Sequence, residues 1–226
     1  MQMKKNKIAA KKCIILANGK PPRKSVINYL FKSGYSTLIC ADGGANKAKL
    51  LKLNPEIIIG DFDSISLNTF EYFYNKAKII RITRQNDTDV EKALKWAIKN
   101  KFTEAALIGG TGDRLDHTFC NLGIVLKFFK KIKINLIAER SVLIPYSGNV
   151  ELKTLPGETI SLYGFNKKTK ISTNGLKFQL KDEALPFGVR ESTSNVAVGD
   201  KIKLAIKGGI IFVIREFNIL KTNDFI

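Results

Sequence analysis

The chain has 226 residues, of which 44% are hydrophobic, enough for one large globular domain or two smaller ones. Its formal charge of +18 suits nucleic acid, an anionic membrane surface or phosphorylated ligands, but the lysines are spread evenly, so we attribute most of the charge to composition. No apolar run approaches the ~18 residues that span a bilayer, and no signal peptide is recognisable, so we expect a cytoplasmic protein. Cys13, Cys40 and Cys120 form no CxxC pair, which argues against a disulfide framework or a cysteine metal cluster and predicts buried thiols.

The N-terminal half alternates short β-branched runs with amphipathic segments of helical period. Strands are predicted at residues 12–17, 37–41, 57–59, 77–82, 105–108 and 133–138. After a loose basic arm at residues 1–11, helices are predicted at residues 23–32, 45–53, 67–75, 88–100 and 113–130. This strict alternation predicts an α/β fold with a doubly wound, mostly parallel sheet and helices on both faces.

The pattern changes near residue 140, where the helical periodicity stops. From Ser141 onward we predict no helix, and short alternating stretches are separated by glycine-containing segments typical of hairpins, at residues 147–149, 156–157, 174–175 and 208–209. This spacing predicts a small antiparallel β-sandwich or barrel. We therefore expect two domains, residues 1–140 and residues 141–226.

The stretch Ile57-Ile58-Ile59-Gly60-Asp61-Phe62-Asp63-Ser64 carries the strongest chemical signal. Three isoleucines predict a buried strand, and two carboxylates separated by one residue follow it. If the chain stays extended, Asp61 and Asp63 point the same way, with Cβ atoms about 6–7 Å apart, and can share a hard cation such as Mg²⁺. The alternative is a polar turn in which Asp61 or Ser64 caps the following helix, and this stretch alone does not decide between them.

Two further polar loops follow predicted strands. Asp42-Gly43-Gly44 lets the backbone approach a ligand closely and leads into a helix N-terminus, although for this loop alone a plain Asp-Gly turn is the favoured interpretation. Gln85-Asn86-Asp87-Thr88-Asp89 opens the helix of residues 88–100, and Thr88 with Glu91 predicts a capping box. Asp89 would complete a metal site with Asp61 and Asp63 if these loops converge.

The segment Gly109–His117 joins three glycines to a helix N-terminus, which predicts a phosphate cradle. Arg114 offers a fork of donors suited to phosphate, and Asp116 is the carboxylate available to a substrate. The alternative has Asp113 as the N-cap of the helix and Asp116 as a partner of the helix dipole. His117 is the only histidine, and such a residue beside a carboxylate is more often structural than catalytic.

Missing motifs exclude several enzyme classes. The chain has no G-x-x-x-x-G-K-[ST] loop, no G-x-G-x-x-G after its first strand, no protein-kinase HRD or DFG sequence and no nucleophile elbow. What remains is a rim of aspartates and glycines able to hold Mg²⁺ and a polyphosphate. Because phosphoryl transfer needs positioning and charge neutralisation more than covalent chemistry, the residues predict Mg²⁺-dependent chemistry on a phosphorylated substrate.

Five motifs resemble, in order, those of the thiamine pyrophosphokinase family. They are Ala41–Asn46, Gly60–Ser64, Asp87–Asp89, Gly109–His117 and Ser192–Asn195. The resemblance covers nearly the whole chain. It implies an N-terminal α/β catalytic domain that binds ATP and Mg²⁺, and a C-terminal β-sandwich that binds thiamine and forms a homodimer with sites at the subunit interface. The implied reaction transfers the pyrophosphoryl group of ATP to the hydroxyl of thiamine, giving thiamine diphosphate and AMP.

The resemblance also implies roles for individual residues. The implied metal ligands are Asp42, Asp61, Asp63 and Asp89. The implied catalytic residues are Asp61, Asp63, Gln85, Asp89, Arg114 and Asp116, with Asp89 and Asp116 both candidates to accept the hydroxyl proton. ATP would contact Asn46, Thr88, Gly109, Gly110, Thr111, Gly112 and Arg114. Thiamine would contact Asp116, Ser194 and Asn195, in a pocket that the partner chain helps to form.

The sequence departs from the family pattern at its aromatic residues. The only tryptophan, Trp96, lies in the N-terminal half, so the C-terminal tryptophan on which relatives stack thiamine has no counterpart. Phe187 and Phe212 are the candidates to replace it. Two other functions compete: a pyrophosphokinase for another alcohol, such as a hydroxymethyl pterin, and a basic nucleic-acid-binding protein. The Ser-Asn motif favours thiamine, and aspartates lining a cleft repel nucleic acid unless a metal intervenes.

Overall fold

The structure is a computed structural model that describes residues 10–223, so residues 1–9 of the predicted basic arm lie outside the described residues. The chain divides into two compact units. The first comprises Met1–Asn121 and Lys130–Lys133, and the second comprises Leu122–Phe129 and Ile134–Ile226.

The elements of the first half follow the predicted order, and no end is shifted by more than three residues. The strands are β1 (Lys12–Leu16), β2 (Tyr35–Ala41), β3 (Ile57–Gly60), β4 (Lys78–Arg81) and β5 (Glu104–Ile108). The helices are α1 (Lys24–Lys32), α2 (Gly44–Leu50), α3 (Leu67–Phe73), α4 (Asp89–Lys99) and α5 (Leu115–Phe128). The α2 helix ends three residues earlier than predicted because Leu51 and Lys52 turn the chain, Lys52 with a positive φ of 52°.

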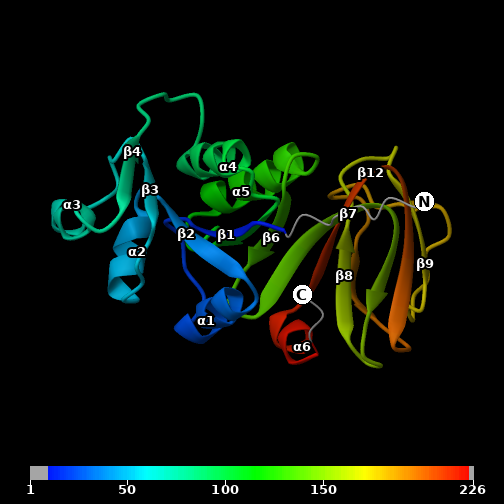
Figure 1. Cartoon of the computed structure of the whole chain (residues 1–226). Coiled ribbons are helices and arrows are strands. Elements are labelled where there is room, and N and C mark those ends of the chain that lie inside the picture. Colours follow the sequence, from blue (N-terminus) through cyan, green and yellow to red (C-terminus); the bar gives the residue numbers. More distant parts are fainter. Residues whose placement is uncertain (1–9, 224–226) are drawn as a thin grey trace, which may run out of the picture. The chain divides into compact units, whose positions relative to one another are not determined.

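The strands of the first unit form a parallel sheet in the order β5-β1-β2-β3-β4. All residues of β3 and β5 are buried, as expected for strands covered on both faces. Helices α1 and α2 pack on one side of this sheet and α4 on the other (Figure 1). Because the strands are parallel, the loops after β1, β2, β3 and β5 all leave from one edge of the sheet, where open α/β sheets bind their ligands.

The second unit is built from antiparallel strands. They are β6 (Lys133–Ile137), β7 (Ser141–Lys153), β8 (Thr159–Tyr163), β9 (Lys170–Asn174), β10 (Glu183–Ala184), β11 (Ser192–Val196) and β12 (Lys201–Glu216). The long strand β12 pairs with β7, β8 and β9, while β11 pairs with β8. Their inward side chains form one core of mostly leucine and isoleucine, including Ile160, Leu162 and Val213. The antiparallel pairing agrees with the hairpin signals of the C-terminal half.

Two of the predicted hairpin turns are wrong. Gly148 lies inside β7 and Gly208 inside β12, both with positive φ, at 75° and 72°. The pairing of β7 with β12 shifts register between Ile206 and Ile211, so these glycines belong to an irregularity within one long strand pair. Glycine permits positive φ in bulges as well as in turns, and residue type alone does not separate the two.

A short helix also contradicts the prediction that no helix follows Ser141. Helix α6 (Phe217–Thr222) comes directly after β12 and buries Phe217 and Leu220 on one face. Six residues are too few for a helical period to stand out in the sequence, and the burial of these two side chains explains why the turn forms.

At 14 residues α5 is the longest described helix, and no helix within residues 10–223 is long and apolar enough to cross a membrane. Cys13 and Cys40 are buried as predicted. Cys120 is exposed, contrary to the prediction, because it lies on the outward side of α5 beside the exposed Phe119.

Candidate active site

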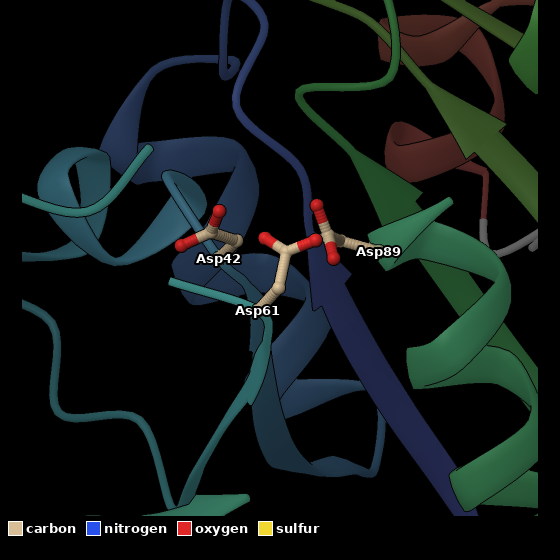
Figure 2. Close-up of side chains that lie close together, drawn as sticks. All are labelled: Asp42, Asp61 and Asp89. Carbon is tan, nitrogen blue, oxygen red and sulfur yellow. The ribbon is translucent and has the colours of Figure 1, made fainter. Parts of the chain in front are cut away.

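Three aspartates meet at the carboxyl edge of the parallel sheet. Asp42 follows β2, Asp61 follows β3, and Asp89 is the first residue of α4. One carboxylate oxygen from each lies within 4.8 Å of the others, so three loops that are far apart in sequence converge here (Figure 2). We call these residues the acidic triad. Three carboxylates this close repel one another unless a cation lies among them, and oxygen ligands of this kind suit Mg²⁺.

Asp42 is the most constrained member of the acidic triad. It is 1% exposed and adopts a φ of 41°. Its Oδ2 accepts a hydrogen bond from the Ser64 amide at 3.0 Å, whereas its buried Oδ1 has no hydrogen-bond partner among the described residues. Burial, together with the neighbouring carboxyls of Asp63 and Asp89, outweighs the Ser64 amide and raises the pKa of Asp42 to about 6. A buried oxygen without a donor is one that a cation would satisfy.

Gly60 permits the close approach of Asp42 and Asp89. A Cβ at this position would lie 2.7 Å from the Asp42 Cβ and 3.2 Å from the Asp89 Oδ1. The end of β3 therefore passes against the acidic triad only because residue 60 has no side chain.

The extended chain assumed for Asp61-Phe62-Asp63 is wrong. Phe62 has a φ of 72°, and the Asp61 Oδ1 accepts a hydrogen bond from the Asp63 amide at 3.5 Å. This turn directs the Asp63 side chain away from Asp61 and toward Asp42. Asp63 is exposed, accepts a hydrogen bond from the Ser64 hydroxyl at 2.8 Å and lies beside the carboxyl of Asp42. Asp63 therefore contacts the site at Asp42 and does not lie side by side with Asp61.

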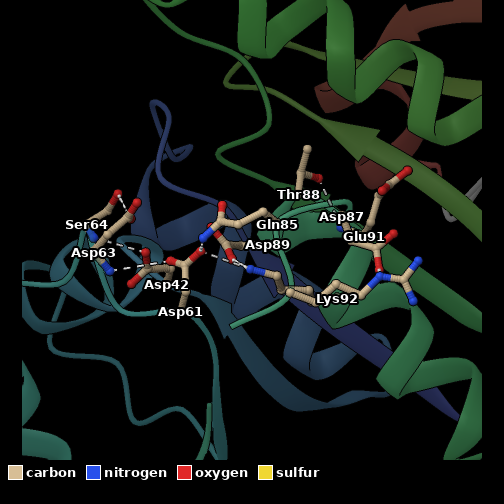
Figure 3. Close-up of polar contacts among 11 residues, drawn as sticks. Asp42, Asp61, Asp63, Ser64, Gln85, Asp87, Thr88, Asp89, Glu91 and Lys92 are labelled. Carbon is tan, nitrogen blue, oxygen red and sulfur yellow. Dashed lines mark hydrogen bonds and ion pairs between the residues drawn. The ribbon is translucent and has the colours of Figure 1, made fainter. Parts of the chain in front are cut away.

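A lysine that the sequence did not single out lies within the site. The side chain of Lys92 is 2% exposed, and its Nζ donates to the Asp89 Oδ1 at 2.8 Å and to the Asp61 Oδ2 at 3.2 Å (Figure 3). Burial opposes the charge of Lys92, but the hydrogen bonds to Asp89 and Asp61 outweigh it and raise the pKa of the ammonium group. Burial likewise opposes the charge of Asp61, and Lys92 lowers the pKa of that carboxyl. The only sequence signal was a spacing of three residues from Asp89 on one helix.

The segment before α4 reaches the acidic triad through Gln85. Its Nε2 donates to the Asp61 Oδ2 at 3.4 Å. The Thr88 Oγ1 accepts from the Glu91 amide at 3.3 Å, so the predicted N-cap of α4 is present. Because this hydroxyl accepts one hydrogen bond, its own proton remains available to a ligand.

Asn46 secures the loop that carries the aspartates after β3. Its Nδ2 donates to the Ser64 carbonyl at 2.9 Å, and its Oδ1 accepts from the amide and hydroxyl of Ser66, both at 3.1 Å. The amide group is thereby committed to holding this loop against α2.

The glycine-rich loop after β5 is fastened to the loop after β1. The Gly19 amide donates to the Gly109 carbonyl at 2.9 Å, and the Lys20 amide donates to the Thr111 carbonyl at 2.7 Å. A Cβ at Gly19 would lie 2.4 Å from the Thr111 carbonyl oxygen, so glycine is required for this approach. The carbonyl of Gly110 accepts from the Asn121 side chain at 2.8 Å. These hydrogen bonds hold the backbone of the two loops in place at the same sheet edge as the acidic triad.

Arg114 and Asp116 form an exposed pair at the start of α5. The Arg114 Nε donates to the Asp116 Oδ1 at 2.9 Å, and the Nη2 donates to Oδ2 at 2.6 Å. The Arg114 hydrogen bonds hold the pKa of Asp116 well below its usual range. His117 Nε2 lies 3.9 Å from the same carboxylate and is itself exposed. In this arrangement both carboxylate oxygens of Asp116 accept hydrogen bonds from Arg114.

The C-terminal candidates lie in the second unit. Asn195 is 1% exposed, and its side chain accepts from the Phe178 amide at 3.1 Å and donates to the Phe178 carbonyl at 2.7 Å, which fastens the segment between β9 and β10 to β11. Ser194 has a φ of 54°, and its amide donates to the Ser161 hydroxyl at 3.0 Å. Phe187 is exposed, but Phe212 is 2% exposed, so Phe212 is not available to stack on a ligand.

Comparison with known proteins identifies the class of enzyme. The model of the family described as "Thiamin pyrophosphokinase, catalytic domain" matches residues 29–137. The model described as "Thiamin pyrophosphokinase, vitamin B1 binding domain" matches residues 145–211. Both matches describe thiamin pyrophosphokinase, and they place the chain among the diphosphotransferase enzymes. The chain belongs to the thiamine pyrophosphokinase family.

Individual relatives support this assignment over most of the chain. Thiamin pyrophosphokinase 1 of Caenorhabditis elegans is 31% identical over 223 residues, which cover 91% of this chain and 89% of the relative. Thiamine pyrophosphokinase of Bacillus subtilis is 26% identical over 184 residues, covering 76% of this chain and 86% of the relative. The fold is similar to that of yeast thiamin pyrophosphokinase, with a TM-score of 0.78, 21% identity and coverage of 96% of this chain and 90% of that one.

Proposed function

We propose that the chain carries out the reaction of its family at the carboxyl edge of the parallel sheet. In that reaction the hydroxyl of thiamine attacks the β-phosphorus of ATP, thiamine diphosphate forms and AMP leaves. The activity is that of a thiamine pyrophosphokinase. The acidic triad is the observation that supports this location for the reaction. Its three converging carboxylates can hold the metal ion that a bound polyphosphate needs.

Mg²⁺ fits the acidic triad on two grounds. The triad offers hard oxygen ligands from three separate elements, and the buried Oδ1 of Asp42 has no hydrogen-bond donor among the described residues. Asp42, Asp61 and Asp89 would hold the ion, and Asp63 would join them through its position beside Asp42. When bound, Mg²⁺ neutralises phosphate oxygens and offsets the charge that develops as AMP leaves.

The surrounding residues would position ATP. The backbone of Gly109, Gly110, Thr111 and Gly112 forms the fixed loop that would face the phosphates, with the Arg114 guanidinium free to move from Asp116 to a phosphate. The Thr88 hydroxyl has a proton to donate, and Gln85 is already hydrogen-bonded to Asp61. Asn46 would act mainly by holding the loop between β3 and α3 in place.

Two aspartates compete for the role of proton acceptor from the thiamine hydroxyl. Asp116 is a weak base while it is paired with Arg114, because that pairing lowers its pKa. Asp89 lies in the acidic triad, next to the place where the phosphates would be bound. Asp89 is likewise paired with a cation, Lys92, so both aspartates remain candidates, with Asp116 contacting the substrate once Arg114 has turned to ATP.

The C-terminal residues would complete the thiamine site in a homodimer. Ser194 is exposed, whereas the buried Asn195 holds the segment around Phe178 against β11, so we assign contact with thiamine to Ser194 and a supporting role to Asn195. Phe187 is the remaining candidate for an aromatic contact. We keep the division at residues 140 and 141, which lies between the two family matches, and the β-sandwich as the form of the second domain.

Product analysis tests this function. AMP and thiamine diphosphate would be measured after incubation with Mg²⁺-ATP, with thiamine, with a hydroxymethyl pterin and with neither. We expect AMP only when thiamine is present, in equal amount to thiamine diphosphate. AMP formed only with the pterin would keep the chemistry and change the substrate. Absence of AMP under all conditions, together with salt-dependent binding of nucleic acid, would overturn the enzyme assignment.

A further inference from the structure

Lys92 occupies a position that is unfavourable for a cation on two counts. Its side chain is 2% exposed, and it lies in the first turn of α4, where the helix dipole is positive. Neither local propensity nor burial favours a lysine here. A compensating interaction must therefore hold the ammonium group in place.

That compensation comes from two members of the acidic triad. The ammonium donates to Asp89, three residues earlier on the same helix, and to Asp61, which follows β3 (Figure 3). It thus links the end of a strand to the start of a helix through their carboxylates. Asp42 makes no such contact, and its Oδ1 remains without a donor among the described residues.

The ionised groups of the site carry more negative than positive charge. The acidic triad and Lys92 together carry a net charge of about −2 when all four groups are ionised, and the exposed carboxylate of Asp63 beside Asp42 adds one further negative charge. We propose that Lys92 is a positioning residue of the metal site. It holds the Asp61 and Asp89 carboxylates facing one another before the cation arrives, and its fixed positive charge lowers the negative charge that the cation must offset. This inference rests on the proposed metal site.

The alternative is that Lys92 only fills space at the base of α4. Three variants separate these roles. Lys92→Met keeps the length of the side chain and removes the charge, Lys92→Gln keeps a donor without the charge, and Lys92→Arg keeps the charge. A positioning role predicts that Arg is tolerated best, whereas a space-filling role predicts that Met is.

Thermal unfolding of the full chain, with chelator and with saturating Mg²⁺, tests the inference. Without metal, K92M leaves two facing carboxylates unpaired, so we expect its Tm to fall by about 3–6 °C. Mg²⁺ should restore more than half of that loss, since it takes over the neutralisation, and K92R should stay close to wild type. An equal loss with and without Mg²⁺, or no loss, would overturn the proposal.

A double variant separates this inference from the metal site itself. In Asp61→Asn the ammonium has lost one partner, so adding K92M should lower the Tm by less than K92M does alone. Fully additive losses in chelator would overturn the link between Lys92 and Asp61. If Mg²⁺ fails to raise the Tm of wild type while the coupling in chelator is present, the metal site is wrong and the positioning of the two carboxylates stands.

Discussion

The two units each bury charged groups, but in different ways. In the second unit Arg215 and Glu158 form a pair with 3% and 0% exposed side chains. The guanidinium donates to both carboxylate oxygens, at 2.6 and 2.8 Å, and to the Lys153 carbonyl at 2.7 Å. In the first unit the acidic triad outnumbers Lys92, and one buried oxygen of Asp42 has no donor among the described residues. A balanced pair stabilises a fold, whereas an unbalanced cluster indicates that a ligand is to be bound.

The largest effect is expected when one negative charge is removed from the acidic triad. Asp61→Asn keeps the shape of the site but weakens the cation site, so kcat/KM for thiamine should fall about a thousandfold, equivalent to about 4 kcal/mol in the barrier. Steady-state kinetics with a matched Asp182→Asn control, an exposed aspartate of the second unit, checks this. Wild-type kinetics in the Asp61 variant would contradict the location of the active site.

Breaking the balanced pair should give the opposite profile. Arg215→Met leaves Glu158 buried without its partner and should lower the free energy of unfolding by about 3 kcal/mol. The kcat of the molecules that remain folded should be unchanged, because the pair lies in the core of the second unit. Denaturant unfolding and kinetics at low temperature measure the two quantities. A loss of kcat without a loss of stability would show that the pair also serves the site.

The pH dependence of the metal-free protein sharpens the comparison further. Asp42 has a pKa raised to about 6 by burial, above its value of 3.8 in an unfolded chain. The folded protein therefore takes up this proton more readily than the unfolded chain, and stability should rise as the pH falls from about 6 toward about 4, by about 2 kcal/mol from this group. Asp42→Asn should remove the rise, as measured by unfolding in chelator across that range.

With Mg²⁺ present the same group should act in the other direction. A proton on Asp42 competes with the cation, so stabilisation by Mg²⁺ should shrink as the pH falls below about 6. If Mg²⁺ stabilises wild type equally at all pH values in this window, Asp42 is not a ligand.

The smallest effect is expected at the start of α4. Thr88→Ala removes the hydroxyl that accepts from the Glu91 amide and should lower the free energy of unfolding by about 1 kcal/mol. Thr88→Ser keeps the cap and should retain most of the stability. If the hydroxyl also contacts ATP, Thr88→Ala raises the KM for ATP while Thr88→Ser does not. An unchanged KM in both variants would remove Thr88 from the nucleotide site.

The sequence predicted two of the three members of the acidic triad from topology. Alternating strands and helices predict parallel strands whose carboxyl ends meet, so Asp61, Asp63 and Asp89 were expected to converge if their loops did. Asp42 entered the predicted ligand set only through the family resemblance, and in the structure it lies with Asp61 and Asp89 in the place expected for Asp63. The orientation of Asp63 was missed because a positive φ at Phe62 is not written in the residue type. Lys92 was missed because a lysine on an amphipathic helix resembles any other solvated lysine until its burial is known.

The C-terminal half was predicted less completely for a related reason. Glycine marks a position where positive φ is allowed, but whether Gly148 and Gly208 turn the chain or distort a continuous strand depends on pairing partners many residues away. The buried Phe212 and the exposed Phe187 were equivalent in the sequence and differ only in the packing of the second unit.

The most direct test of the central claim is to locate the cation. A crystal of the full chain grown with Mn²⁺ and an unreactive ATP analogue would be measured at the manganese absorption edge. The account predicts an anomalous peak within coordinating distance of Asp42, Asp61 and Asp89, with the phosphates of the analogue on its open side. A peak elsewhere, or a nucleotide bound without a cation near these aspartates, would contradict it.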